Sequence, residues 1–521
     1  MSADLRWELT RPLHVIGGKW SNFDTSVVNP AFGTSSGTVT WLPSADSSFE
    51  TYTDWHQLAP KVGLAYQATP KMVVRGSAGI TYVPLGWNGY SGVPYGSAVG
   101  YNAINQINQV SPQAAAFQWD DTPYPGNYIA PTGPQPGSTY IPWGPAEVDP
   151  KTRKLGMMEN WYAGLQYQLP ANTRFEVSYL GSSGRNLHDG TLNPTNFPTW
   201  SSYQKLLNSG HIWDWVSDQG SASSAGVRYP YSGFGGPAYF AINPYPQVQS
   251  CYCGGVLFTN SPLGQSGYNA LTFEGSKQRG FLSLDLSYTW ARSTGNTSSA
   301  FFDTWTFGQN FQDPYKYKQE AAVSQTNSTV KGFVAYTLPF GHNRRFLSSN
   351  RVEDFLFGGW KLGTIVSYGN AGQMGAIGSR NYYPGWSAVY ANVASGAKLK
   401  NTFKRYDPSW NPTVPGTAAD PASLFFDPTV FSDPNYGELG NSPRIFPNWR
   451  GWAAPNESGS LLKKTSFGRE RQYTVTLRAE FFDLFNRHYY SVNTSMSSAY
   501  FGHVNGVSGN RTGQLGARFE W

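Results

Sequence analysis

Apolar and polar residues alternate with a period of two along much of this chain. The clearest segment runs from Phe281 to Trp290, where every second residue is Leu, Tyr or Trp and the residues between them are polar. Successive side chains of a β-strand point to opposite faces, so the pattern predicts a strand with one apolar face. The segment from Tyr268 to Lys277 alternates in the same way, and residues 278–280 between the two form a short polar turn. Together they predict a β-hairpin.

The same unit recurs along the chain. One hairpin has a longer basic connector, which contains Arg344, Arg345 and Arg351. The further pairs of segments are Val62–Tyr66 with Met72–Tyr82, Trp161–Leu169 with Phe175–Tyr179, Val330–Leu338 with Trp360–Tyr368, and Leu461–Phe467 with Tyr473–Phe481. A shorter pair opens the chain, Leu5–Leu9 with Leu13–Trp20, and a last strand closes it, Leu515–Trp521. The pattern therefore predicts about thirteen strands.

Long polar and aromatic stretches separate these hairpins. They cover roughly residues 83–154, 182–267, 292–326, 370–457 and 485–509. Loops of this length are uncommon within a compact soluble domain. Outer-membrane β-barrels, in contrast, have short periplasmic turns and long extracellular loops. The order of strand, short turn, strand and long loop predicts an all-β protein. We expect one antiparallel transmembrane β-barrel region over residues 1–521.

The composition fits this interpretation. Aromatic residues make up 16% of the chain and charged residues 13%, and mean hydropathy is −0.43. The sequence holds no run of 18 apolar residues, which a membrane-spanning helix needs, whereas a tilted strand crosses a bilayer with about 9–11 residues. Tyr and Trp recur at strand ends, as the aromatic girdles of membrane barrels require. Charged residues fall on the polar parity of the strands, where they would line a polar interior: Arg174, Glu176, Glu274, Asp285, Arg478, Glu480, Arg518 and Glu520.

From about residue 58 onward the chain resembles the Oar-like TonB-dependent receptors, whose N-terminal domain is carboxypeptidase-regulatory-like. The stretches that carry the resemblance are residues 58–66 (LAPKVGLAY), 74–76, 160–161, 177–181, 267–271, 336–341 (YTLPFG), 358–360 and 478–486. The last strand resembles the signal that the barrel-assembly machinery reads, with apolar residues alternating up to a terminal aromatic residue: Leu515, Ala517, Phe519 and Trp521.

The resemblance implies a cell outer membrane protein of a Gram-negative organism, surrounded by outer-membrane lipid. It further implies uptake of a large solute such as an oligosaccharide, a peptide or a chelate. Receptors of this family close about 22 strands around a plug, so about thirteen strands would form part of a barrel. A signal peptide, a TonB box and a plug have no counterpart here, and the TonB system would act only through a plug. With Trp521 in the periplasm, an odd strand count places Met1 on the extracellular side. We therefore expect a fragment that begins inside the barrel.

The sequence offers little catalytic chemistry. The seven histidines are dispersed without metal-ligand spacing, and no phosphate loop or dinucleotide fingerprint occurs. No basic block favours nucleic acid. We expect neither an enzyme nor a cofactor. Glu274 and Asp285 lie on facing strands of one hairpin and could mimic a carboxylate pair, although lining of a solvated lumen is the favoured interpretation. Cys251 and Cys253 are either incidental loop residues or a local redox pair.

Aromatic side chains in the loop at 83–154 are the candidate ligand-binding residues. Flat aromatic faces suit sugar rings or the apolar parts of peptides, and loops carry recognition on a rigid scaffold. The candidates are Trp87, Tyr90, Tyr95, Trp119, Tyr124 and Trp143. Packing of the loops against one another would explain the same residues. The alternative function is that of a secreted or surface carbohydrate-binding protein or adhesin, which would use the aromatic residues without moving a solute.

Overall fold

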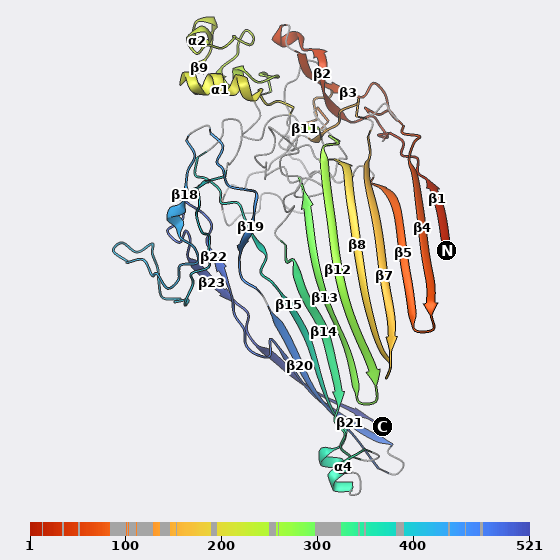
Figure 1. The fold of residues 1–521 in the computed structure, drawn as a ribbon. Coiled ribbons are helices and arrows are strands. Elements are labelled where there is room, and N and C mark those ends of the chain that lie inside the picture. Colours follow the sequence, from red (N-terminus) through yellow and green to blue (C-terminus); the bar gives the residue numbers. More distant parts are fainter. Residues whose placement is uncertain are drawn as a thin grey trace.

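A twelve-stranded antiparallel sheet dominates the computed structural model of the chain (Figure 1). The structure describes residues 1–521 with the exception of 13, 34–35, 50–52, 84–99, 102, 104–110, 112–128, 136–145, 153, 189–194, 249–256, 259, 297–324, 342–343, 348–350, 382–389, 436–437, 454 and 469–471. Within the described part, no helix is long and apolar enough to span a membrane.

The strands of the sheet follow one another in chain order, and each pairs antiparallel with its neighbours. In order across the sheet they are β1 (Ser2–Trp7), β4 (Leu58–Thr69), β5 (Met72–Val83), β7 (Gly156–Leu169), β8 (Thr173–Leu187), β12 (Gly264–Arg279), β13 (Leu282–Gly295), β14 (Ser328–Thr337), β15 (Trp360–Gly369), β20 (Asn456–Phe467), β21 (Tyr473–Phe482) and β24 (Thr512–Glu520). The sheet is not closed, because β1 and β24 are its two edges. An open sheet of this size agrees with the partial barrel that the sequence predicts.

The connections at the two ends of the sheet differ in length. At one end, which we call the turn side, β4–β5, β7–β8, β12–β13 and β20–β21 are joined by connections of five residues or fewer. Gly280 and Gly468 take positive φ there, at 60° and 90°, a conformation that suits glycine. At the other end, the loop side, the long connections gather (Figure 1). The five predicted hairpins are confirmed, and the turn side corresponds to the periplasmic side of an outer-membrane barrel.

Strand register collects the apolar rows on one face, which we call the outer face. Leu165 of β7, for example, pairs with Val74 of β5 and with Val177 of β8. Leu165 is 43% exposed, and the large apolar residues of the other strands on this face are exposed in the same way. A sheet face of this kind requires lipid as its solvent. The prediction that one face of each strand meets lipid is therefore supported.

The opposite, inner face is mainly polar, although Phe333 and Ile365 also lie on it, and it holds its own side-chain network. Arg174 of β8 forms an ion pair with Glu274 of β12, with 2.5 Å between Nη2 and Oε1. The hydroxyl of Tyr162 donates a hydrogen bond to Oε1 of Glu176 at 3.1 Å. All eight charged residues predicted on the polar parity lie on this face by register. Glu274 is thus paired with Arg174, which favours the lumen-lining interpretation over a carboxylate pair with Asp285.

The predicted strand at Leu13–Trp20 is wrong. Gly17 and Gly18 both have positive φ, at 85° and 65°, and turn the chain there. The strand that follows, β2 (Ser21–Val28), pairs with β3 (Ser36–Trp41) in a separate hairpin on the loop side. The sheet therefore has twelve strands, and β1 runs antiparallel to β4, toward the loop side. The predicted odd count, and with it the predicted extracellular position of Met1, is incorrect.

Shorter elements build the loop side. The short strand pairs are β6 (Ala146–Glu147) with β11 (Leu257–Phe258), β9 (Trp215–Val216) with β10 (Gly236–Pro237), β16 (Gln373–Gly375) with β19 (Ile445–Arg450), β17 (Asn392–Val393) with β18 (Phe431–Ser432), and β22 (Tyr489–Val492) with β23 (Val504–Ser508). The helices are α1 (Trp200–Ser209), α2 (Gln219–Ser224) and α3 (Ala238–Ala241), with 3-10 turns at Pro30–Phe32 and Pro428–Val430; α4 (Arg351–Phe357) lies on the turn side.

Two of these loop regions have cores of their own. The helical module contains α1, α2 and α3, and its buried core is Tyr203, Leu206, Ile212, Val216, Ala222, Ala225, Phe234, Ala238 and Tyr239. The aromatic module has the buried core Ile377, Ala391, Phe425, Phe426, Phe431, Phe446, Trp449 and Val504. Aromatic rings in this second core meet edge to face, as Phe426 and Trp449 do at 4.9 Å between centroids. The loops are thus folded structures beside the sheet.

Candidate functional site

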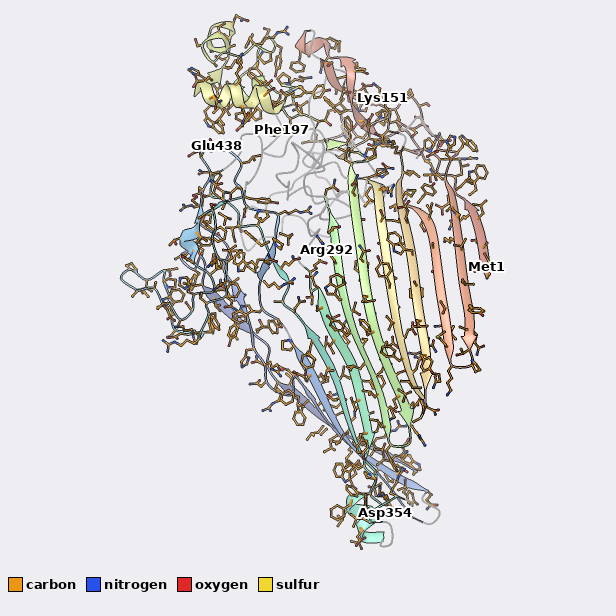
Figure 2. The ribbon with its side chains drawn as sticks, in the orientation of Figure 1. Met1, Lys151, Phe197, Arg292, Asp354 and Glu438 are labelled. Carbon is orange, nitrogen blue, oxygen red and sulfur yellow. The ribbon has the colours of Figure 1, made fainter. Side chains whose placement is uncertain are left out.

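A cleft of about 640 Å³ lies where β13, β14 and β15 reach the loop side, next to β19. Figure 2 labels Arg292, which lies in the part of β13 nearest the loops. The cleft is lined by Trp290, Arg292, Ser293, Gln325, Asn327, Ser328, Asn370, Gln373, Pro443, Ile445, Pro447 and Arg450. Most of these side chains are amides, hydroxyls or guanidinium groups, so the cleft is suited to a polar solute.

Amide side chains form the floor of the cleft by continuing the hydrogen bonding of the strands. Gln325 accepts from the backbone N–H of Ser293 at 2.8 Å and donates to its carbonyl at 2.7 Å. Asn327 donates to the carbonyl of Ala291 at 2.9 Å. Each amide side chain therefore takes the place of a neighbouring strand where the backbone hydrogen bonds of the sheet end. It pairs with backbone groups of β13 that would otherwise lack a partner.

Arg450 fixes the wall of the cleft. Its Nη1 donates to the carbonyl of Ala371 at 2.7 Å, and its Nη2 donates to Oδ1 of Asn327 at 2.5 Å. Gln373, the strand partner of Arg450, donates to the carbonyl of Pro447 at 3.0 Å. A planar guanidinium group with several donors can join separate segments in this way. Arg450 thus holds β19 against the ends of β14 and β15.

The alternation along β19 links the cleft to the aromatic module. Ile445, Pro447 and Arg450 line the cleft, whereas Phe446 and Trp449 are buried in the core of the module. One strand therefore carries both the wall of the cleft and part of a packed core. The position of Arg450 depends on that core, because residues on rigid, packed elements are held more accurately than residues on free loops.

The described lining of the cleft carries positive side chains. Arg292 and Arg450 bring two guanidinium groups, and no Asp or Glu is among the described residues that line it. The ring of Trp290 adds a flat apolar surface. Within the described part of the chain, no cluster of three His, Cys, Asp or Glu residues could hold a metal ion. The chemistry that the lining offers is recognition of carboxylate, phosphate or hydroxyl groups by fixed donors.

A buried serine and histidine meet in the aromatic module. Oγ of Ser423 lies 2.8 Å from Nδ1 of His503 and donates to the carbonyl of Asp420 at 2.9 Å. Burial lowers the pKa of His503, and the nearby Asp420 carboxylate opposes this shift. Because the single hydroxyl proton of Ser423 is engaged with a backbone carbonyl, the serine accepts from His503. The pair is a buried structural contact between segments 80 residues apart.

The structure describes only some of the site residues that the sequence predicts. The six loop aromatics at 87, 90, 95, 119, 124 and 143 lie outside the described residues, as do Cys251 and Cys253. Leu515, Ala517 and Phe519 share the outer face at the edge strand β24, and the ring of Trp521, one residue beyond the strand, stacks on that of Phe519 with 5.7 Å between centroids. There the ring of Phe519 stacks on Tyr473, with 6.0 Å between centroids. Their role as an assembly signal remains a prediction.

The cleft itself was not predicted from sequence. Its lining comes from three strand ends and from β19. The first and last of these residues in the sequence, Trp290 and Arg450, are 160 positions apart. The available signal was local: Gln325 and Asn327 directly precede one alternating segment, and Asn370 directly follows the next. Amides at strand ends are common in turns as well, so the pattern alone did not separate a cleft from a loop.

A family model described as the outer membrane beta barrel domain matches residues 2–514. The chain belongs to this family. It is therefore a protein of the cell outer membrane, and the outer face of its sheet is the surface that contacts lipid. The location and the β-barrel class predicted from the sequence are confirmed.

Comparison with solved structures finds outer-membrane transporters and receptors. The outer membrane transporter YddB from Escherichia coli aligns with a TM-score of 0.38 and 6% identity over 89% of this chain and 41% of that chain. The FrpB iron transporter from Neisseria meningitidis aligns with a TM-score of 0.36 and 10% identity over 90% of this chain and 39% of that chain. The siderophore receptor PiuA from Acinetobacter baumannii aligns with a TM-score of 0.35 and 9% identity over 93% of this chain and 39% of that chain. The chain thus spans about two fifths of these proteins. No curated protein sequence matches it.

Proposed function

We propose that this chain forms part of the wall of an outer-membrane transporter or receptor that takes up a large polar solute bearing an anionic group. The observation that carries the proposal is the loop-side cleft, whose described lining residues include Arg292 and Arg450 and no Asp or Glu. A peptide, a chelate or an acidic oligosaccharide has the matching chemistry, because guanidinium groups bind carboxylates with charge-assisted hydrogen bonds. The polar inner face of the sheet supports passage of such a solute toward the turn side.

The other parts of the proposal rest on the sequence. The aromatic residues of the loop at 83–154, from Trp87 to Trp143, would contact sugar rings or apolar parts of the solute. The strand that ends in Trp521 would be read by the barrel-assembly machinery. TonB would act through a plug contributed from outside these 521 residues. In this proposal the protein is a non-catalytic carrier without a cofactor.

A second candidate is a surface adhesin that binds its ligand without moving it. The helical module favours this function, because Trp213 and Trp215 remain exposed beside its packed core. Exposed Trp side chains on a rigid element are frequent at binding surfaces. The outer-membrane location leaves the surface adhesin, and not a secreted protein, as the alternative.

Binding of a charged and an uncharged sugar to the full chain in phospholipid vesicles tests the proposal. The probes are fluorescent oligogalacturonate and maltohexaose of equal length. We expect oligogalacturonate to bind more tightly, and Arg292→Gln to weaken its binding roughly tenfold or more, since hydrogen bonds to charged groups contribute strongly. Arg279→Gln, at the turn-side end of β12, is the matched control and should leave binding unchanged.

Two outcomes would contradict the proposal. Equal affinity for both sugars, unaffected by Arg292→Gln, would remove the cleft as the recognition site. Binding that depends on Arg292 without entry of the sugar into the vesicles would favour the adhesin.

A further inference from the structure

The connector between β14 and β15 differs from the other turn-side connections. It spans residues 338–359 and contains α4, whereas the other hairpins turn within a few residues. Figure 2 labels Asp354 of α4, at the turn-side tip of the molecule. Most of its large apolar side chains are exposed: Phe346, Leu347, Val352, Phe355, Leu356 and Phe357. Such a dense group of apolar side chains on an otherwise polar end marks an interaction surface.

Hydrogen bonds hold α4 against the outer face of the sheet. Trp360 and Lys463 are directly paired on β15 and β20, on the same face as the apolar pair Leu362 and Leu461. Nε1 of Trp360 donates to the carbonyl of Leu356 at 3.1 Å. Nζ of Lys463 donates to the same carbonyl and to that of Gly358, both at 3.0 Å. The C-terminal end of the helix is therefore fixed on the lipid-facing side.

Two arginines of the connector, and Lys463 of β20 beside it, lie next to aromatic rings. The guanidinium group of Arg344 lies 5.1 Å from the ring centroid of Phe281, and that of Arg345 lies 5.3 Å from the ring of Phe346. Nζ of Lys463 lies 5.0 Å from the ring of Trp360. Cations next to aromatic rings at the edge of an apolar belt are typical of the membrane–water interface, where phosphate groups supply the opposite charge.

We propose that α4, together with the described residues 344–347 of the connector, is an interfacial anchor that inserts into the headgroup region of the periplasmic leaflet. Val352, Phe355 and Leu356 reach the boundary of the acyl chains, while Arg344 and Arg345 contact lipid phosphates. Phospholipid is the occupant because the exposed group is continuous with the lipid-facing row at Leu362 and Leu461. The carbonyls of Leu356 and Gly358 at the C-terminal end of the helix already accept hydrogen bonds from Trp360 and Lys463, which lowers the cost of placing this segment at the edge of the bilayer.

Fluorescence quenching can locate the connector relative to the bilayer. The full chain, with Cys251→Ser and Cys253→Ser, would carry single cysteines labelled with the fluorophore NBD in phosphatidylethanolamine–phosphatidylglycerol vesicles. The test positions are V352C and F355C. The lipid-facing control is L165C, and the water-facing control is K71C in the tight turn of β4–β5. We expect both test labels to emit at shorter wavelength than K71C and to be quenched by doxyl-labelled lipid as strongly as L165C.

Two results would overturn the anchor. Strong quenching of V352C and F355C by iodide, equal to that of K71C, would place α4 in water. A short-wavelength emission that neither iodide nor doxyl lipid quenches would show that protein covers the helix, and dilution to one chain per vesicle would then identify a second copy. Heat-modifiable migration on gels establishes for each variant that the sheet has assembled.

Discussion

Large apolar side chains stay on the surface of the sheet, whereas the same residue types are buried in the aromatic module. Leu515 of β24 is 85% exposed, while Phe425 and Phe426 are 0% exposed. Both regions draw on one aromatic-rich composition. The sheet has a polar inner face and must leave its apolar face to lipid. The module has no such solvent and packs ring against ring. Exposure of an apolar side chain therefore reports which medium surrounds each part of this protein.

Removal of a buried ring should lower the free energy of unfolding more than any other change considered, and only in the aromatic module. Phe425→Ala deletes a fully buried side chain that contacts Phe426, Trp449 and Trp452. We expect a loss of about 3–5 kcal/mol in the free energy of unfolding of the module, because the change leaves a cavity. Hydrogen exchange of residues 374–504 measures it. Val414→Ala, at an exposed position nearby, is the control, and equal loss of protection in the sheet would show that the two regions unfold together.

A charge on the lipid-facing row should have the next largest effect, and only in the sheet. Leu165→Arg places a cation near the middle of β7 on the outer face, where it should cost about 2–4 kcal/mol. Gln166→Arg, one residue further along the same strand, places the same cation on the polar inner face, beside Glu176. Urea unfolding of the two variants in phospholipid vesicles measures the difference between their free energies of unfolding. Equal destabilisation would mean that the two faces do not meet different media.

The sheet could be predicted from sequence because its two faces meet different media. Every second residue between Leu282 and Trp290 is apolar, and a shift by one residue would turn the whole row to the wrong face. The same logic failed at Leu13–Trp20, where the apolar positions surround two glycines that turn the chain. A short segment with few apolar residues cannot fix a register, so glycine conformation decided its structure.

The cleft and the aromatic module could not be predicted, for a different reason. Phe425 and Val504 meet in one core although 79 residues separate them in the numbering, and their segments show no sustained alternation. Irregular segments that pack through side chains have no period that a sequence could display. The residues of β19 gave a partial signal, since Phe446 and Trp449 face the core between Ile445, Pro447 and Arg450.

A change of pH should have the smallest effect on stability, and it should affect the aromatic module but not the sheet. Burial lowers the pKa of His503 below its ordinary value of 6.5, and Ser423 and the ring of Trp410 contact the imidazole. The unfolded chain then binds a proton at higher pH than the folded module does. The stability of the module is therefore complete above pH 6.5 and falls as the pH drops below that value, until the folded imidazole also becomes protonated. Hydrogen exchange of residues 374–504 between pH 7.5 and 5 follows this loss. His503→Gln should flatten the dependence, whereas an unchanged slope in the variant would assign it to other groups.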